Sequence, residues 1–158
     1  MKSLTLVIAA VVSVGLFIAA GDPRPGAPDA TKEGDEKTIR ALLHDLGEEW
    51  NKHEMKEFTA RMGENADAVN RFGQWMKGRA AIREHLITLH GSPIRPMLES
   101  RSSKIEQVRF LTPDVALAHE LTDEKTGKSV RTYVLQKRDG QWWIESADIV
   151  QQGQALHP

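Results

Sequence analysis

Between Asp35 and Trp50, apolar residues recur every three or four positions, as they do on the buried side of an amphipathic helix. These residues are Ile39, Leu42, Leu43, Leu46 and Trp50. The same spacing over Met55–Met62 predicts a shorter second helix, which we expect Gly63–Asn65 to end. A third helix is predicted over Arg79–His90, because the apolar spacing recurs there and a glycine follows.

In the second half of the chain the pattern changes to the alternation of strands. A short hairpin comes first, in which a strand from Asp67 to Phe72 turns through Gly73-Gln74 into Trp75–Lys77. Later strands are bounded by turn residues such as Asp139-Gly140, which is typical of a tight hairpin. The longer predicted strands are Met97–Leu111, Val115–Thr122, Ser129–Lys137 and Gln141–Gln151. Helices first and strands last predict an α+β domain with N-terminal helices packed on an antiparallel sheet.

The first residues have the composition of a secretory signal. Residues 4–20 carry no charge and follow Lys2, and the small residues Ala19, Ala20 and Gly21 offer a processing site. We therefore expect a signal peptide over residues 1–21 and a secreted or periplasmic protein. The alternative is an uncleaved N-terminal membrane anchor, since the apolar stretch approaches the length that spans a bilayer.

The rest of the chain is interpreted as one domain. Residues 22–34 are rich in proline and lack large apolar side chains, which predicts a flexible spacer. A folded domain over residues 35–152 and a short tail over 153–158 follow. The chain has 158 residues and no cysteine, so core packing rather than disulfides must hold the domain together. A lipid anchor on cysteine is excluded.

The charges of the chain nearly balance. There are 21 Lys and Arg residues against 22 Asp and Glu residues, a net charge of −1, and loss of Lys2 with the leader makes the charge more negative by one. This balance gives no electrostatic reason to expect nucleic acid or an anionic membrane surface as a partner.

The sequence contains no recognisable motif for a metal or a cofactor. His53-Glu54-x-x-Glu57 lacks the second histidine of the zinc motif His-Glu-x-x-His, and His85 and His90 do not share a side of their helix. There is no Gly-x-Gly-x-x-Gly and no phosphate-binding loop, so we expect no nucleotide, nicotinamide or flavin cofactor.

Several short motifs occur in order over residues 36–150. They are Trp50-Asn51, Ala66-Asp67-Ala68-Val69, Gly73-x-Trp75-x-x-Gly78-Arg79-x-x-Ile82-x-x-His85, Val108-x-Phe110-Leu111-x-Pro113-Asp114-Val115-Ala116-Leu117 and Asp139-Gly140-x-Trp142-x-Ile144. In this order they resemble the SnoaL-like, SgcJ/EcaC (DUF4440-like) branch of the NTF2-like superfamily. The resemblance implies a cone in which helices pack on a strongly curved antiparallel sheet around an apolar pocket. Because relatives range from isomerases, dehydratases and cyclases to domains without known catalysis, it implies no single activity.

Alternation along the predicted strands indicates which ionisable residues would face such a pocket. His119 shares a side of its strand with Leu117 and Leu121, so we expect it among apolar neighbours, and Asp148 shares a side with Trp142. A histidine and an aspartate that meet in an apolar pocket could act as base and orienting group in proton transfer, so His119 and Asp148 are the predicted catalytic pair. The alternative is that His119 is a hydrogen-bonded core or interface histidine and Asp148 lies exposed at a strand end.

Four further residues are predicted ligand contacts: Trp50, Trp75, Arg109 and Tyr133. Arg109 could clamp an acidic ligand, although a lone arginine on a strand also fits a surface charge pair. Tyr133, the only tyrosine, shares a half-solvated side with Arg131 and fits a dimer surface as well. His85 is expected to have a packing role.

Three functions remain open from the sequence. The first is an exported domain whose pocket binds a small apolar or mixed-polarity molecule, with no specific activity assigned. The second is an enzyme of the isomerase, dehydratase or cyclase type that uses His119 and Asp148. The third is a structural or interaction module whose pocket is filled by its own side chains. In each case we expect a homodimer formed through the sheet.

Overall fold

The computed structural model describes residues 30–153. Its helical segments are α1 (Ala30–Lys52), α2 (Met55–Ala60), α3 (Arg79–His90) and the 3₁₀ turn η1 (Arg95–Met97). Its strands are β1 (Met62–Val69), β2 (Trp75–Lys77), β3 (Ser100–Thr112), β4 (Val115–Glu124), β5 (Gly127–Arg138) and β6 (Gln141–Gln151). The predicted leader, most of the predicted spacer and most of the predicted tail lie outside the described residues.

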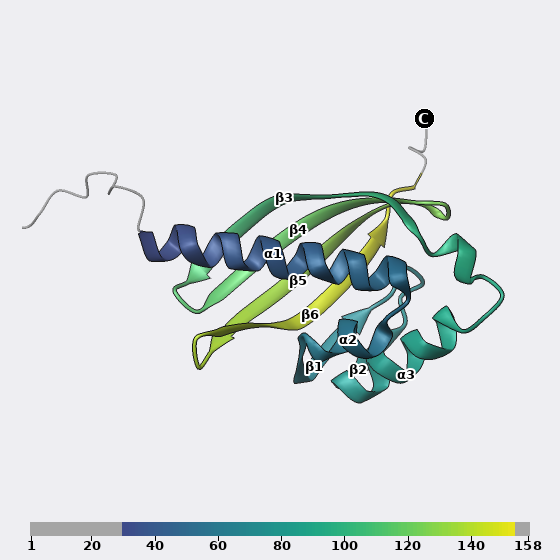
Figure 1. Ribbon diagram of the computed structural model, residues 1–158, viewed down its shortest axis with the longest axis horizontal. Helices are drawn as coiled ribbons and strands as arrows, with labels where there is room; N and C mark the ends of the chain where they lie inside the picture. Colours follow the sequence, from purple (N-terminus) through teal and green to yellow (C-terminus); the bar gives the residue numbers. More distant parts are fainter. Residues whose placement is uncertain (1–29, 154–158) are drawn as a thin grey trace, which may run out of the picture.

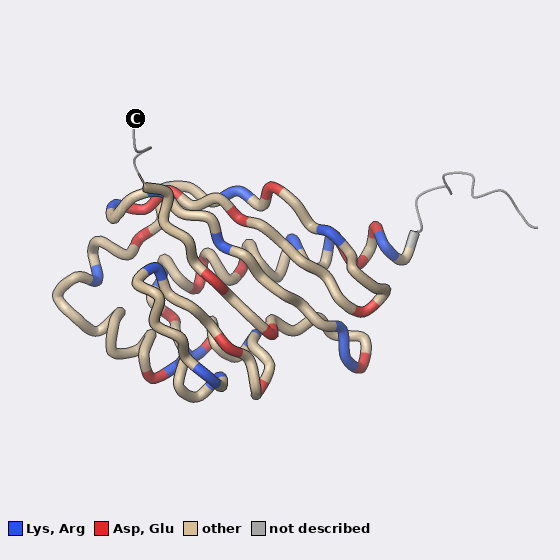
Figure 2. The backbone as a smooth tube through the Cα atoms, turned by 180° about the vertical axis from the view of Figure 1, so that it is seen from behind, with Lys and Arg blue, Asp and Glu red and all other residues tan. Residues whose placement is uncertain are grey.

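The strands form one sheet in the order β2-β1-β6-β5-β4-β3. Neighbouring strands are antiparallel except for β1 and β6, which are parallel. The predicted antiparallel sheet has one parallel pair, because β1 joins it beside the last strand and runs in the same direction. The α+β class is confirmed. The three α-helices lie on one face of the sheet (Figure 1), and no described helix covers the other face, which is seen from behind in Figure 2.

The apolar stripe of α1 packs on the inner face of the sheet, as its spacing predicted. Its buried residues are Ile39, Leu43, Leu46 and Trp50. They belong to one core with Trp142 and Ile144 of β6. Since burying a leucine or isoleucine side chain contributes about 1.5–3 kcal/mol, this stripe is a principal attachment of α1 to the sheet.

The first helix begins earlier than expected. It starts at Ala30, so residues 30–34 are helical rather than part of a spacer. The carboxylate of Asp35 accepts hydrogen bonds from Lys137 Nζ at 2.8 Å and from Trp142 Nε1 at 3.0 Å. These bonds tie the first part of α1 to the hairpin of β5 and β6.

The second helix is shorter than expected, because the chain turns into β1 before Gly63. α2 ends at Ala60, and Met62 is buried where β1 meets Ile144 of β6. Ile144 N donates to Arg61 O over 3.1 Å. Pairing with the sheet therefore overrides the helical spacing of Met62. The predicted bounds of α3 and β6 are confirmed.

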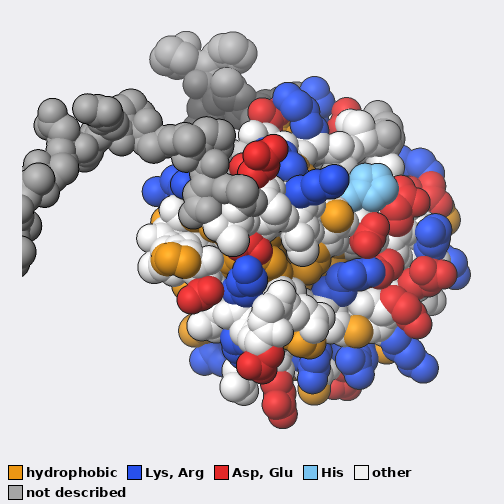
Figure 3. Space-filling model, turned by 60° about the vertical axis from the view of Figure 1, so that its left-hand side comes forward, with side chains coloured by type: hydrophobic (Ala, Val, Ile, Leu, Met, Phe, Trp, Pro, Cys, Tyr) orange, Lys and Arg blue, Asp and Glu red, His pale blue; other side chains and the backbone are white. Residues whose placement is uncertain are grey.

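The surface carries charges of both signs. In Figure 3, Lys and Arg side chains are interspersed with Asp and Glu over the end of the molecule where α1 begins. Within residues 30–153, no helix has both the length and the apolar character needed to cross a membrane.

Candidate functional site

A cavity of about 420 Å³ lies between the helices and the inner face of the sheet. Its wall is mostly apolar, and the interior is lined by buried side chains from α1, α2, α3, β1 and β5 and from the segment before β3. They include Trp50, Phe58, Met62, Leu86, Leu98 and Tyr133. Ligand sites of proteins commonly have volumes of about 300–1,000 Å³, so the cavity is large enough for a small molecule.

The mouth of the cavity is marked by residues that line it and are also exposed. Phe72, in the loop between β1 and β2, is 86% exposed, and Ile94, after α3, is exposed as well. Gln74 and Gln151 also line the cavity and are exposed. The mouth therefore combines apolar side chains with neutral amides.

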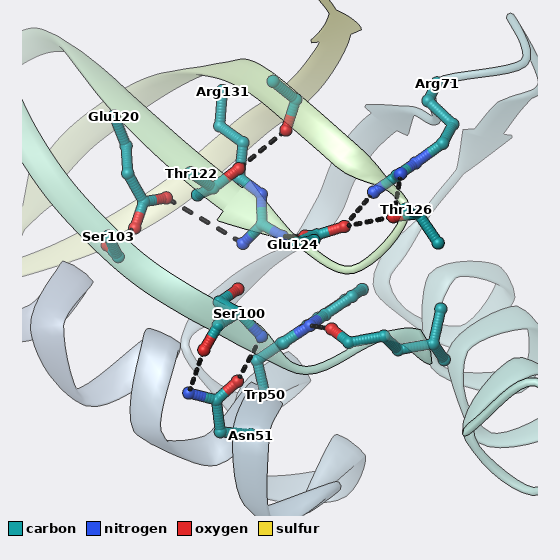
Figure 4. Close-up of polar contacts among 12 residues, drawn as sticks. Trp50, Asn51, Arg71, Ser100, Ser103, Glu120, Thr122, Glu124, Thr126 and Arg131 are labelled. Carbon is teal, nitrogen blue, oxygen red and sulfur yellow. Dashed lines mark hydrogen bonds and ion pairs between the residues drawn. The ribbon is translucent and has the colours of Figure 1, made fainter. Parts of the chain in front are cut away.

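Two carboxylates of β4 are buried behind the cavity wall. Glu124 is fully buried and accepts hydrogen bonds from Arg131, from Arg71 and, over 3.1 Å, from Thr126 Oγ1 (Figure 4). Arg131 is 4% exposed, and its guanidinium lies 4.8 Å from the ring centroid of Trp50. Because Arg71, Arg131 and Trp50 line the cavity, this group of charges supports its wall.

The second carboxylate, Glu120, is 1% exposed. It accepts hydrogen bonds from Ser103 Oγ and, over 2.7 Å, from the Tyr133 hydroxyl, and it lies 3.9 Å from Arg131 Nη1. Burial and the Glu120 charge raise the pKa of Tyr133, so this phenol stays protonated. Burial alone would lower the pKa of Arg131, but Tyr133, Glu120 and Glu124 outweigh it and raise that pKa. Arg131 is therefore a permanent cation.

Two histidines form a polar joint between the ends of α1 and α3. His53 Nδ1 lies 2.7 Å from His90 Nδ1, and the edge of the His90 ring packs on Trp50 with a centroid distance of 4.4 Å. Burial, followed by the charges of His53 and Arg95, lowers the pKa of His90 to about 4. Burial and Arg95 also lower the pKa of His53. Near pH 7 both rings are neutral, so one donates and the other accepts.

The structure places His119 on the face of the sheet away from the cavity. The buried side of β4 consists of Ala116, Ala118, Glu120, Thr122 and Glu124, and His119 alternates with them. The prediction that His119 faces inward with Leu117 and Leu121 is therefore wrong. The physical reason is that Arg131 and Arg71 neutralise the inward carboxylates, so the side of β4 with the more polar sequence is the buried one.

A β-bulge reverses the alternation in β6. Ile144 and Ser146 pair with consecutive residues of β5, which leaves Glu145 as an extra residue. Trp142 and Ile144 face the core before the bulge, and Ala147 lines the cavity after it. Alternation counted from Trp142 is therefore out of step beyond residue 145.

The bulge places Asp148 on the opposite side from Trp142, so that prediction is wrong too. Asp148 pairs with Thr132, whose neighbour on the other side is His119, so a whole strand separates the predicted catalytic pair. Asp148 borders the cavity at the end of β1, where its Oδ1 accepts a hydrogen bond from Val69 N over 3.2 Å. The two residues do not meet in the cavity, and their catalytic role stays a prediction.

Of the four predicted ligand contacts, the structure brings Trp50 and Tyr133 to the cavity and leaves Trp75 and Arg109 outside its lining. Trp75 is 57% exposed, and its Nε1 donates to Asp67 Oδ2 over 2.9 Å. Arg109 is exposed on the edge strand β3. The expected half-solvated side of Tyr133 is wrong, because this side of β5 is buried against the helices.

Sequence reasoning missed Glu120, Glu124 and Arg131, and it gave His85 only a packing role although His85 lines the cavity. The available signal was the hairpin register, since β4 and β5 pair Glu120 with Arg131. Among residues 30–153, no three His, Asp or Glu side chains are grouped closely enough to hold a metal ion.

Comparisons with solved structures identify the class of the fold. A domain of unknown function with a cystatin-like fold from Nostoc punctiforme PCC 73102 is 23% identical over 77% of this chain and 80% of that chain, with a TM-score of 0.69. An NTF2-like protein of unknown function from Pseudomonas putida KT2440 is 20% identical over 78% and 91% of the two chains, with a TM-score of 0.65. A hexachlorocyclohexane dehydrochlorinase (LinA) Type2 is 14% identical over 78% and 88%, with a TM-score of 0.57.

The chain therefore has the NTF2-like, cystatin-like fold, which confirms the resemblance at the level of the fold. No protein-family model and no curated protein matches its sequence. The comparisons do not distinguish the SnoaL-like, DUF4440-like branch, which stays a prediction.

Proposed function

We propose that this domain binds a small, largely apolar molecule in the cavity between its helices and its sheet. The observation that carries the proposal is the cavity itself, about 420 Å³ in volume, with a mostly apolar wall and an open mouth. Ligand sites combine an apolar lining with a few polar groups, and this cavity fits that description. The leader-like residues 1–21 support a place of action outside the cytoplasm.

A cavity-filling substitution tests binding directly. Leu89 is half-buried on α3 and lines the cavity, so Leu89→Trp should place an indole in the space that a ligand would use. We expect the affinity for Nile red, a neutral dye whose emission depends on polarity, to fall about tenfold or more, the equivalent of about 1.4 kcal/mol. Fluorescence titration measures this change.

The matched control is Ile87→Trp on the same helix, because Ile87 is exposed and is not part of the cavity lining. This variant should bind Nile red within about twofold of the wild type, since it leaves the pocket unchanged. Equal affinities for the two variants, both folded by circular dichroism, would contradict binding in this cavity. Native mass spectrometry of the exported protein would also report a retained ligand and the position of the mature N-terminus.

We also propose that two copies associate through the outer face of the sheet. No described helix covers this face (Figure 2), and its middle strands present the apolar side chains of Leu117, Leu121, Val130 and Val134. Such faces commonly mark interaction sites. A twofold axis between β4 and β5 would bring β3, with Arg109 outward, over β6 of the second copy.

Leu117→Glu should shift the protein toward the monomer. An apolar anchor at the centre of an interface contributes about 2 kcal/mol, so the dissociation constant should rise about thirtyfold. Size-exclusion chromatography with light scattering measures the mass, and Ile87→Glu is the control, since Ile87 is exposed on α3. A wild-type protein that is monomeric at high concentration would contradict the proposal.

A further inference from the structure

We propose that the cavity selects an uncharged ligand, namely an apolar molecule whose hydroxyl or carbonyl group remains at the mouth. This inference rests on the proposed binding function and names the class of molecule bound. The supporting observation is that the arginines, the indole and the phenol around the cavity already bind other groups of the protein.

The two arginines beside the cavity are already paired and leave no free guanidinium for an anionic ligand. Arg131 forms an ion pair with Glu124 and lies close to Glu120. Arg71 forms an ion pair with Glu124 and donates a hydrogen bond to Thr126. The two arginines therefore face two buried carboxylates, a neutral set. An anionic headgroup would add a third negative charge near this set without an opposite charge, and a buried unpaired charge is strongly unfavourable.

The polar groups of Trp50 and Tyr133 in the interior are also hydrogen-bonded within the protein. Trp50 Nε1 donates to Leu98 O over 2.6 Å, and the Tyr133 hydroxyl donates to Glu120. Arg131 Nε has no hydrogen-bond partner among the described residues, but this atom is buried. A headgroup in the interior would thus lose its hydration without meeting a free guanidinium, indole or phenol donor. His85, half-buried on α3, also lines the cavity and has no hydrogen-bond partner among the described residues, so a ring nitrogen can pair with a hydroxyl or carbonyl group.

The mouth of the cavity has exposed polar side chains that can bind a headgroup. Gln74 and Gln151 are exposed there and carry neutral amides. Gln74 Oε1 accepts from Asn70 and Gln151 Nε2 donates to Thr126 O, which leaves the Gln74 amide nitrogen for a carbonyl or hydroxyl group and the Gln151 amide oxygen for a hydroxyl group. The geometry therefore orients a ligand with its apolar end against Phe58 and Leu86 and its polar group outward.

Three probes with the same chain and different headgroups test this inference on the folded protein at pH 8. Decanol, decanoate and decylammonium are titrated as competitors of bound Nile red. Because the charged headgroups lack a partner, decanol should bind about tenfold more tightly than either ion. Decanoate or decylammonium that binds as tightly as decanol would overturn the inference while leaving the binding function intact.

If neither Nile red nor any of the three probes binds, the proposed function and the inference are both overturned.

A charge variant provides a second test of the inference. Gln74→Lys places a cation at the mouth and should improve decanoate binding about threefold to tenfold, with little effect on decanol. Gln141→Lys makes the same change of charge at an exposed position that does not line the cavity, and it should leave both affinities unchanged. An equal gain in both variants would overturn the inference that the mouth holds the headgroup.

Discussion

Replacing Arg131 with methionine should lower the free energy of unfolding by about 3–5 kcal/mol, the range found when one partner of a buried ion pair is removed. Arg131 is 4% exposed and donates to Glu124, which is fully buried. Methionine retains an unbranched apolar chain but lacks the guanidinium and its charge, so the variant leaves Glu124 with Arg71 as its remaining cation. Urea denaturation followed by circular dichroism measures the change.

A surface pair provides the matched control. Arg138→Met removes the cation that binds Glu145, but Arg138 is 45% exposed in its side chain, and pairs of this kind contribute about 0–1 kcal/mol. The double variant Arg131→Met, Glu124→Gln should be less destabilised than the sum of the two single variants, because it removes both charges of the pair. A loss below about 1 kcal/mol for Arg131→Met would contradict the view that these charges support the cavity wall.

The helices could be predicted from the sequence because each depends mainly on local spacing. The stripe that ends at Trp50 predicted the buried side of α1, and the predicted bounds of α3 agree with the structure. The end of α2 could not be predicted in this way. Met62 continues the helical spacing, but it pairs with Ile144, which lies far away in the sequence.

The candidate site was harder to predict, because a strand has two sides and composition did not identify the buried one. The turn between β4 and β5 fixes the pairing of Glu120 with Arg131, so this neighbourhood could be derived from the sequence. Which side faces the helices depends on whether the carboxylates find cations inside. One of these cations is Arg71, which comes from the loop between β1 and β2, so alternation within β4 alone could not predict the buried side.

The position of Asp148 shows a second limit. A single extra residue, Glu145, moves every later side chain of β6 to the other side, and no glycine or proline marks the bulge in the sequence. Trp50 and Tyr133 were nevertheless placed correctly at the cavity. Both are large aromatic side chains, which bury much apolar surface in a core, although the half-solvated side expected for Tyr133 was wrong.

Acidification should destabilise the protein through His90, and His90→Gln should remove part of this effect. The pKa of His90 is about 4 in the folded protein and near 6.5 when it is unperturbed. Below pH 6.5 the unfolded chain binds a proton at His90 that the folded protein does not bind. The contribution of His90 to the free energy of unfolding is therefore fully present above pH 6.5 and is lost as the pH falls from about 6.5 to about 4. At 1.36 kcal/mol for each pKa unit, the expected loss is about 3 kcal/mol.

The measurement is urea denaturation from pH 7 to pH 4 for the wild type and for His90→Gln, with His44→Gln as the control, since His44 lies exposed on α1. Carboxylates such as Glu124 also lose stability in acid, so the informative quantity is the difference in slope between the variants. Glutamine does not titrate and can still bond to His53, so its curve should be flatter, whereas His44→Gln should follow the wild type. Equal slopes for all three proteins would contradict the buried neutral pair. Because the His90 ring packs on Trp50, which lines the cavity, a confirmed slope would link protonation at this joint to the stability of the cavity wall.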